Sequence, residues 1–311
     1  AQRHRAGARA QPGGEVAESA VGGGGEHDRG VDRGALGPDD RDALGRLQRQ
    51  LRAHQVGERA ELGLQGHELV GEEVLGVGRA TKLLRFLQLL PKSYECEIVF
   101  GTETNTLDAA GEVTATYDMT VDPAEATAAT AQFTGDIQQV PPMVSAVKID
   151  GKRLHELARK GIEVDRPPRP VTVYRYDVEP TDDPLVYRAF VDCSSGTYVR
   201  VLAADLGHAL GGGAHLRKLR RTSVGAFTLA DATSLEDVTV IPMAEAVRGF
   251  PIVRVDEATE AAIRVGAVLD SAALGVAGTG PWPILSPTGE LLAMYEPFGD
   301  GRVKPVVVLV G

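Results

Sequence analysis

The stretch of sequence that decides the fold is Asp192-Cys-Ser-Ser-Gly-Thr-Tyr-Val-Arg-Val-Leu-Ala-Ala-Asp-Leu-Gly207. An apolar run ends here in small hydroxyl residues and a glycine, and a helical pattern over residues 199–210 follows. The backbone N–H groups at the start of such a helix can bind an anion. Arg200 falls in the first turn, where the helix dipole disfavours a cation. Two interpretations stay open: a surface arginine beside an ordinary turn, or an arginine held by a buried carboxylate or phosphate.

Strand-like and helix-like segments alternate irregularly around this stretch. Residues 92–101 alternate as a strand that places Tyr94, Cys96, Ile98 and Phe100 on one face. A helix is expected to start at Thr81 and to stop at Pro91. Further helices are expected over residues 123–133 and 154–160, and further strands over residues 144–149, 171–178 and 185–193. Because no regular βαβ rhythm appears, we expect an α+β fold with a mixed or antiparallel sheet and flanking helices.

The last part of the chain has a different sequence pattern. Short strand-like runs punctuated by glycine and proline occupy residues 251–255, 282–285, 291–295 and 303–310. A helical piece over residues 258–265 fits a compact, barrel-like module. We therefore expect a small β-rich domain over residues 249–311, in a region where acidic residues dominate.

The composition changes abruptly near residue 75. Residues 1–75 contain no Phe, Tyr, Trp, Ile, Met, Cys, Asn, Thr or Lys, and they include the glycine run 22–25. Three interpretations compete for residues 1–74: a disordered tail, an arm that contacts RNA, or GC-rich DNA translated out of frame. The composition favours the third, and an intact reading frame through these codons would exclude it.

Composition also bounds the class of protein. The net charge of −10 argues weakly against nucleic acid, but basic residues gather over residues 148–169 and 217–221. Apolar runs of transmembrane or signal-peptide length are missing, so a cytoplasmic protein is expected. Cys96 and Cys193 lie in strand-like runs and are expected to be reduced core thiols. Zinc-like Cys/His spacing is absent from the sequence, so a metal is not expected.

Several motifs in order resemble one family. Lys92-Ser-Tyr94 with Gly101, Gln139-Val-Pro-Pro-Met-Val-Ser-Ala-Val-Lys-Ile-Asp-Gly-Lys-Arg153, the run 192–207 and His215-Leu-Arg-Lys-Leu-Arg-Arg-Thr-Ser-Val-Gly225 are similar to motifs of the TruB family of bacterial tRNA pseudouridine synthases. The resemblance is close over residues 75–228 and weaker to residue 311. It implies a pseudouridine-synthase-type catalytic domain over residues 75–235, truncated at its start, and a PUA-like C-terminal domain that contacts RNA.

The resemblance also implies an activity. The family isomerises the uridine at position 55 in the T-loop of tRNA: uracil leaves C1′, rotates and is rejoined through C5. A carboxylate acts at C1′, the base is flipped out of its stack, and neither cofactor nor metal takes part. The implied partner is the T-arm of tRNA, and the implied state is a cytoplasmic monomer.

Roles carry over to single residues by this resemblance. Tyr94 is implied to pack on the uracil and to assist proton removal from C5, Tyr198 to line the nucleotide pocket, and Leu219 to lie below the base. Arg200 is implied to hold the catalytic aspartate. Lys148 and Arg220 are candidate contacts with RNA phosphates. The competing interpretation makes Tyr94, Tyr198 and Leu219 packing residues and the basic residues a solvated face.

The aspartate itself is missing. The family's aspartate motif runs directly into Leu75-Gly-Val-Gly-Arg-Ala-Thr-Lys82, and counting back places its aspartate at Gly66. Asp108 follows the second motif and does not match the nucleophile. We therefore expect an inactive chain in which Arg200 faces an empty or substituted site. The alternatives are a non-catalytic tRNA-binding or tRNA-folding protein and a damaged product that does not fold.

Overall fold

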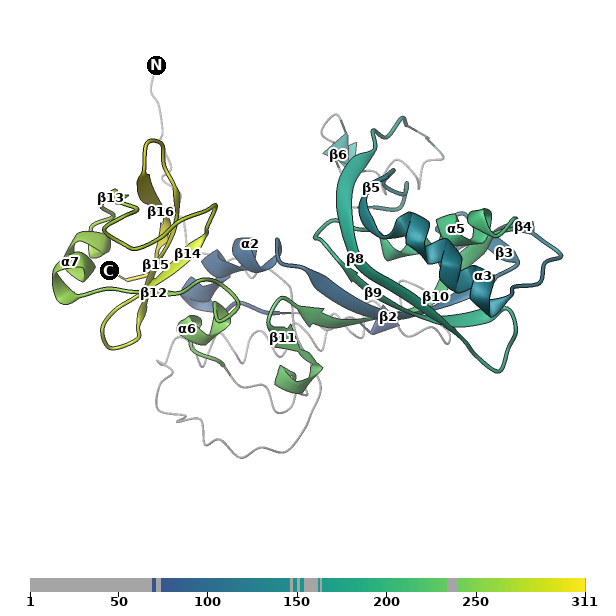
Figure 1. Ribbon diagram of the computed structural model, residues 1–311, viewed down its shortest axis with the longest axis horizontal. Coiled ribbons are helices and arrows are strands. Elements are labelled where there is room, and N and C mark those ends of the chain that lie inside the picture. Colours follow the sequence, from purple (N-terminus) through teal and green to yellow (C-terminus); the bar gives the residue numbers. More distant parts are fainter. Residues whose placement is uncertain are drawn as a thin grey trace, which may run out of the picture.

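The computed structural model of the chain describes residues 69–70, 74–145, 148–149, 152–153, 162, 164–233 and 240–310. Figure 1 shows two sheets at opposite ends of the long axis, with short helices between them. Three expectations lie outside the described residues: the nature of residues 1–68, the helix over residues 154–160 and the aspartate slot at Gly66.

A seven-stranded sheet forms the larger body. All its strand pairs are antiparallel except β1 with β10, so the expected mixed α+β sheet is confirmed. In spatial order its strands are β1 (Leu69–Val70), β10 (Ala214–Val224), β2 (Lys92–Phe100), β9 (Val186–Cys193), β8 (Arg169–Pro180) and β5 (Gly135–Gln139), with β11 (Phe227–Thr228) paired to β10.

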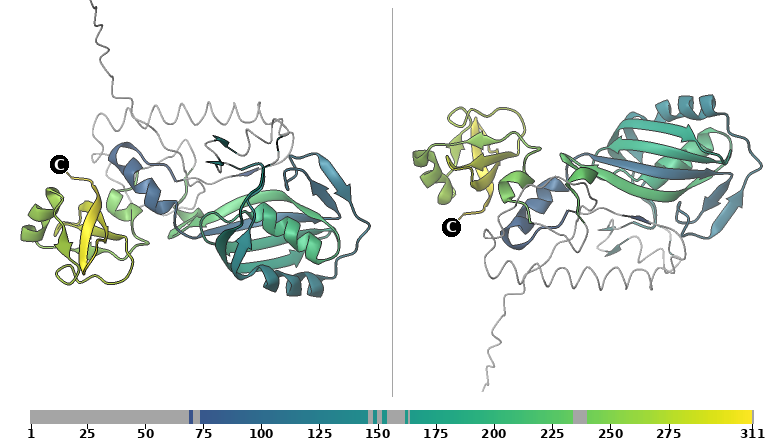
Figure 2. Two further views of the ribbon diagram at one scale, coloured as in Figure 1. Left: turned by 90° about the horizontal axis from the view of Figure 1, so that it is seen from above. Right: turned by 90° about the horizontal axis from the view of Figure 1, so that it is seen from below.

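Helices cover one face of this sheet. Alternation along β2 buries Cys96, Ile98 and Phe100 on that face, as the sequence predicts. They pack against α5 (Val199–Ala209) and α3 (Pro123–Ala129), which continues into the 3-10 helix η3 (Thr130–Phe133). Figure 2 shows α5 lying along the sheet. This burial of apolar surface is the main stabilising contribution to the larger body.

Some expectations about local elements were wrong. The helix expected to start at Thr81 begins earlier, as the 3-10 helix η2 (Gly78–Leu83) followed by α2 (Leu84–Leu87), and the Thr81 hydroxyl donates back to the Gly78 carbonyl. Of the strand expected over residues 144–149, the structure describes only β6 (Lys148–Ile149), paired with β7 (Lys152–Arg153). A hairpin that was not expected follows β2: β3 (Thr102–Thr104) pairs with β4 (Val113–Thr116).

The smaller body is a curled, PUA-like sheet. Its strand order is β12 (Val253–Arg254), β14 (Trp282–Leu285), β15 (Leu291–Pro297), β16 (Arg302–Val308) and β13 (Leu269–Asp270). Helix α7 (Glu257–Arg264) begins at Asp256, whose carboxylate accepts the Thr259 N–H, and it buries Ile263 against the sheet. The elements η4 (Leu229–Asp231) and α6 (Met243–Ala246) lie between the two bodies along the chain.

Residues 78–87 join the two bodies. Leu83 and Phe86 pack with Leu285, Leu291 and Met294 of the smaller sheet. The neighbouring Leu84 and Leu87 pack instead with Phe227 of the larger body. Residues three positions apart lie on the same side of this helical segment. Leu83 and Phe86 therefore face the smaller body, and Leu84 and Leu87 face the larger one.

A hydrogen bond supports this junction, since Arg79 Nη1 donates to the Leu309 carbonyl at 2.8 Å. Among the helices of the described residues, none has the length and hydropathy that a membrane span requires.

Candidate functional site

The first turn of α5 holds an ion pair. Arg200 Nη1 lies 2.7 Å from Asp108 Oδ2, and it also donates to the Thr106 carbonyl at 3.3 Å. The side chains are 27% and 11% exposed, so the pair is shielded from most of the solvent. A carboxylate in contact with the guanidinium offsets the unfavourable position of a cation at a helix N-terminus.

The loop over residues 101–113 holds the Asp108 carboxylate in place. Its Oδ1 accepts the Thr106 hydroxyl at 2.6 Å and the Ala110 N–H at 3.2 Å. The Thr104 hydroxyl donates to the Asp108 carbonyl at 2.7 Å. Leu107, with φ of 61°, turns the chain left-handed just before Asp108. The carboxylate therefore has a defined direction before any ligand binds.

The same loop is anchored to the sheet. The Leu216 N–H of β10 donates to the Leu107 carbonyl at 3.0 Å, and the Ala109 N–H donates to the Leu216 carbonyl at 2.8 Å. These two bonds make a short parallel bridge between Asp108 and Leu216. The expectation that Arg200 faces an empty or substituted site stays a prediction for Gly66, which lies outside the described residues. Within those residues, the Asp108 carboxylate, from the loop after the second motif, contacts the Arg200 guanidinium.

Exchange of Asp108 for asparagine tests this pair. We expect Asp108→Asn to lower the free energy of unfolding by about 1–3 kcal/mol, because a partly buried guanidinium loses its charged partner. The matched control is Asp177→Asn, whose partner Arg175 is about half exposed and whose loss should cost less than about 0.5 kcal/mol. Urea titration measures both values, and equal small losses would contradict a structural role for the pair.

Tyr94 lies on the helix-covered face of β2. Its side chain is partly buried against the main core, and its cross-strand partner on β10 is Arg221. Burial raises the pKa of the Tyr94 hydroxyl, and the Cys193 thiol adds to this shift. The Arg221 guanidinium, which hydrogen-bonds the tyrosine oxygen, acts in the opposite direction on that pKa. Tyr94 thus stays a neutral phenol with a cation beside it.

Two more predicted residues lie near the same face. Leu219 is the cross-strand partner of Cys96 and packs against the core that contains Val199 and Leu202 of α5. Tyr198 is the N-cap residue of α5 and directly precedes its first turn. The structure thus brings Tyr94, Leu219 and the start of α5 around one core.

One predicted phosphate contact does not join this group. Arg220 is the cross-strand partner of Glu95, on the sheet face opposite to Tyr94 and Leu219, and it is exposed. The backbone of Lys148, a second predicted contact, belongs to β6 and pairs with β7. The alternation along β10 therefore separates Arg220 from the adjacent Leu219 and from Tyr94 on β2.

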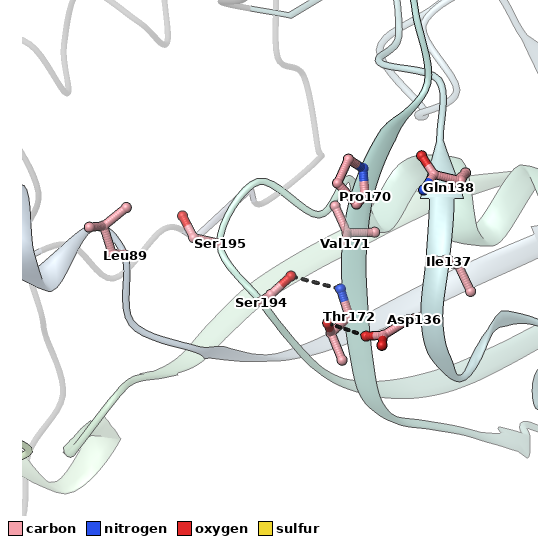
Figure 3. Close-up of a pocket in the computed structure, with 9 residues that line it drawn as sticks. All are labelled: Leu89, Asp136, Ile137, Gln138, Pro170, Val171, Thr172, Ser194 and Ser195. Atoms are coloured by element: carbon pink, nitrogen blue, oxygen red, sulfur yellow. Dashed lines mark hydrogen bonds between the residues drawn. The ribbon is translucent and has the colours of Figure 1, made fainter. Parts of the chain in front are cut away.

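An open groove of about 610 Å³ lies elsewhere, beside the edge of the sheet. Figure 3 shows its lining, with the Ser194 hydroxyl accepting the Thr172 N–H and the Thr172 hydroxyl donating to Asp136. Among the residues that the structure describes, its lining includes a carboxylate, no cation, and none of Tyr94, Tyr198, Arg200 or Leu219. The groove therefore does not suit a phosphate and stands apart from the predicted site.

In the described part of the chain, the cysteines and acidic residues form no metal centre. Both thiols are free and buried, as expected, and burial raises the pKa of Cys96 to about 12 and that of Cys193 to about 11. Within the described ranges, His, Cys, Asp and Glu form no group of three or more that could hold a metal ion.

Comparison with protein families gives two adjoining matches. Residues 70–199 match the N-terminal domain of the TruB family of pseudouridylate synthases, and residues 200–248 match the C-terminal domain of tRNA pseudouridylate synthase B. The first match begins at β1, close to the change in composition near residue 75.

Whole-chain relatives agree with these matches. The tRNA pseudouridine synthase B of Geobacillus thermodenitrificans is 36% identical over 86% of this chain and 94% of its own length. That of Rhodococcus jostii is 41% identical over 90% of this chain and 92% of its own length. Because residues 75–311 make up about three quarters of the chain, both alignments extend upstream of Leu75.

Solved structures share the fold. A Cbf5–Nop10–Gar1 complex contains a chain that superposes with a TM-score of 0.61 at 22% identity, covering 83% of this chain and 81% of that one. A chain of an H/ACA ribonucleoprotein bound to a substrate RNA with 2′-deoxyuridine gives 0.58 at 20% identity, covering 83% and 81%.

Proposed function

Because the chain belongs to the TruB family of tRNA pseudouridine synthases, we propose that its ligand is the T-arm of tRNA and that the base it addresses is the uridine at position 55. The observation that carries this proposal is the Arg200–Asp108 pair at the start of α5. Arg200 lies in the motif 192–207, one of those by which the chain resembles the family, and Asp108 comes from the loop after the second motif. Tyr94 and Leu219 supply an aromatic and an apolar surface for a flipped base.

Each residue has a proposed part. Tyr94 stacks on the uracil, and Arg221 beside its hydroxyl favours the phenolate form that would accept a proton from C5. Leu219 packs below the base, and Tyr198 closes the pocket at the start of α5. Arg200 stabilises negative charge next to C1′. Phosphates are contacted by Lys148 and its basic neighbours, whereas Arg220 would meet RNA only at the opposite sheet face.

The catalytic carboxylate is the part that this chain lacks. By alignment of motifs its slot is Gly66, which has no side chain. Asp108 does not match the nucleophile motif, and its Oδ1 accepts two bonds from its own loop. We therefore propose a chain that holds the family's base-binding face without turnover. The proposed place of action is the cytoplasm, and the proposed state is a monomer.

A second candidate function is a tRNA-binding or tRNA-folding protein without chemistry. The observation that favours it is the same Arg200–Asp108 pair, in which the charge of the guanidinium is balanced by a carboxylate that does not match the nucleophile motif. The small PUA-like sheet, packed on residues 83 and 86, would extend the RNA contact.

RNA binding tests both candidates together. We expect a fluorescent T-arm RNA to bind with an affinity that falls steeply with salt, because Lys and Arg release counterions from phosphates. Lys148→Ala should reduce the slope of log affinity against log salt by about 1. The control is Arg175→Ala, on β8; Arg175 pairs with Asp177, and its loss should leave the slope unchanged. Absence of binding at low salt would reject both candidates.

A further inference from the structure

Helix α5 begins without a cap of its own. Its N-cap residue, Tyr198, has an extended backbone (φ −100°, ψ 102°), and its side chain makes no capping hydrogen bond. Tyrosine lacks the short side-chain oxygen that caps helices. The first turn holds no acidic residue but does hold Arg200. The position of this turn must therefore be set by a contact from outside the helix.

Gln139 makes that contact. The Tyr198 N–H donates to Gln139 Oε1 at 2.9 Å, and Gln139 Nε2 donates to the Tyr198 carbonyl at 3.4 Å. A single amide thus bonds both backbone groups of the N-cap residue across 59 positions of sequence. The side chain is 3% exposed, so water does not replace these bonds if they are lost. A backbone N–H requires an acceptor, which settles the orientation of the amide.

Gln139 also lies at the edge of the sheet, where the chain leaves β5 and a long insertion begins. Gln139 is the last residue of β5, and its cross-strand partner, Arg169, is the first residue of β8. The insertion, residues 140–168, therefore begins and ends beside the same cross-strand pair, Gln139 and Arg169. The base of this insertion is closed by Arg166 Nη1, which donates to the carbonyl of the buried Pro141 at 3.1 Å. Gln139 thus connects the base of the insertion to the first turn of α5.

We propose that Gln139 is a positioning residue that holds Tyr198 and Arg200 in the orientation needed to receive the flipped base. Its loss releases the first turn of α5 and weakens the hold on the target base, while contacts with the RNA phosphates persist. This consequence for RNA rests on the proposed function. The local clamp on Tyr198 does not depend on it.

Amide hydrogen exchange tests the clamp without RNA. In Gln139→Met, which keeps the length of the side chain but not its polar atoms, the Tyr198 amide should exchange roughly 10- to 100-fold faster. Amides in the middle of α5 and in β9 should change less than about 3-fold. The control is Gln138→Met, one residue earlier on β5 and exposed on the opposite face. An unchanged Tyr198 amide, or a uniform rise throughout the sheet, would overturn the proposal.

RNA tests the consequence for the base. A T-arm RNA with 2-aminopurine beside the target uridine reports unstacking, and anisotropy of the same RNA reports total binding. We expect Gln139→Met to lower the unstacking signal roughly 10-fold and to change total binding less than about 3-fold. If Gln139→Met gave an unstacking signal as strong as that of the unchanged chain, the proposal would be contradicted. If the unchanged chain did not bind the T-arm RNA at all, the proposed function would be refuted, and the hydrogen-exchange result would still stand.

A conservative variant supplies a rescue. In Gln139→Glu, a protonated carboxyl can donate to the Tyr198 carbonyl and accept its N–H, as the amide does, whereas a carboxylate repels that carbonyl. The unstacking signal of Gln139→Glu should therefore recover as the pH falls, and that of Gln139→Met should not. Thermal melts at each pH separate recovery of the clamp from recovery of the fold. Equal pH profiles for the two variants would argue against the clamp.

Discussion

T-arm RNA that carries tritium at C5 of the target uridine should release no tritium above the blank when incubated with this chain. The reaction replaces the C5 proton by the new glycosidic bond, so every turnover would release label. The family's carboxylate slot is Gly66, and loss of a nucleophile lowers turnover on the order of 10⁶-fold. The only carboxylate that the structure shows in contact with Arg200, Asp108, is bound by its own loop.

The tRNA pseudouridine synthase B of Rhodococcus jostii serves as the positive control, because it is 41% identical and covers nearly the same length. Release from this chain at a rate comparable to that of the control would refute the predicted inactivity. In that case Asp108→Asn would show whether the loop carboxylate has taken over. Binding without release would agree with the proposed base-holding face.

Phe86→Ala should lower the free energy of unfolding by about 3–5 kcal/mol. The ring is 6% exposed and packs where α2 meets the smaller sheet, beside Leu285, Leu291 and Met294. Its removal leaves a cavity that the neighbouring side chains can fill only in part. Because the ring attaches α2, whose Leu84 and Leu87 pack with the larger body, to the smaller sheet, we also expect urea unfolding to show two transitions.

Leu89→Ala is the matched control for this change. Leu89 lies three residues further along the chain and is 73% exposed, so its truncation should cost less than about 0.5 kcal/mol. Both variants are measured by urea titration with circular dichroism and tryptophan fluorescence, since Trp282 reports the smaller sheet. A loss for Phe86→Ala no larger than that of Leu89→Ala would show that this junction contributes little.

Local patterns predicted the elements that depend on neighbouring residues. Alternation at Tyr94, Cys96 and Ile98 predicted the buried face of β2, and the apolar spacing after Val199 predicted α5 within one residue of its observed end. Strand β14 occupies the predicted residues 282–285. These elements follow from side-chain periodicity, which is a property of consecutive positions.

The candidate site depended more on distant pairings. Strand β10 was not predicted, because its charged residues and two register irregularities obscure the alternation. The sequence excluded Asp108 as a match to the nucleophile motif but did not predict that its carboxylate contacts Arg200. The Thr104 and Thr106 hydroxyls that fold the chain around Asp108 were a local signal that could have identified that loop.

By itself, the sequence determined the family, the alternating faces of the strands and the position of Arg200 at the start of a helix. Only the tertiary structure decided what surrounds that arginine. The Asp108 carboxylate arrives from a loop anchored on β10, and the Gln139 amide arrives from the far edge of the sheet. Neither contact leaves a trace in local periodicity, because its partners meet only when strands pair across the sheet and bury their polar groups together.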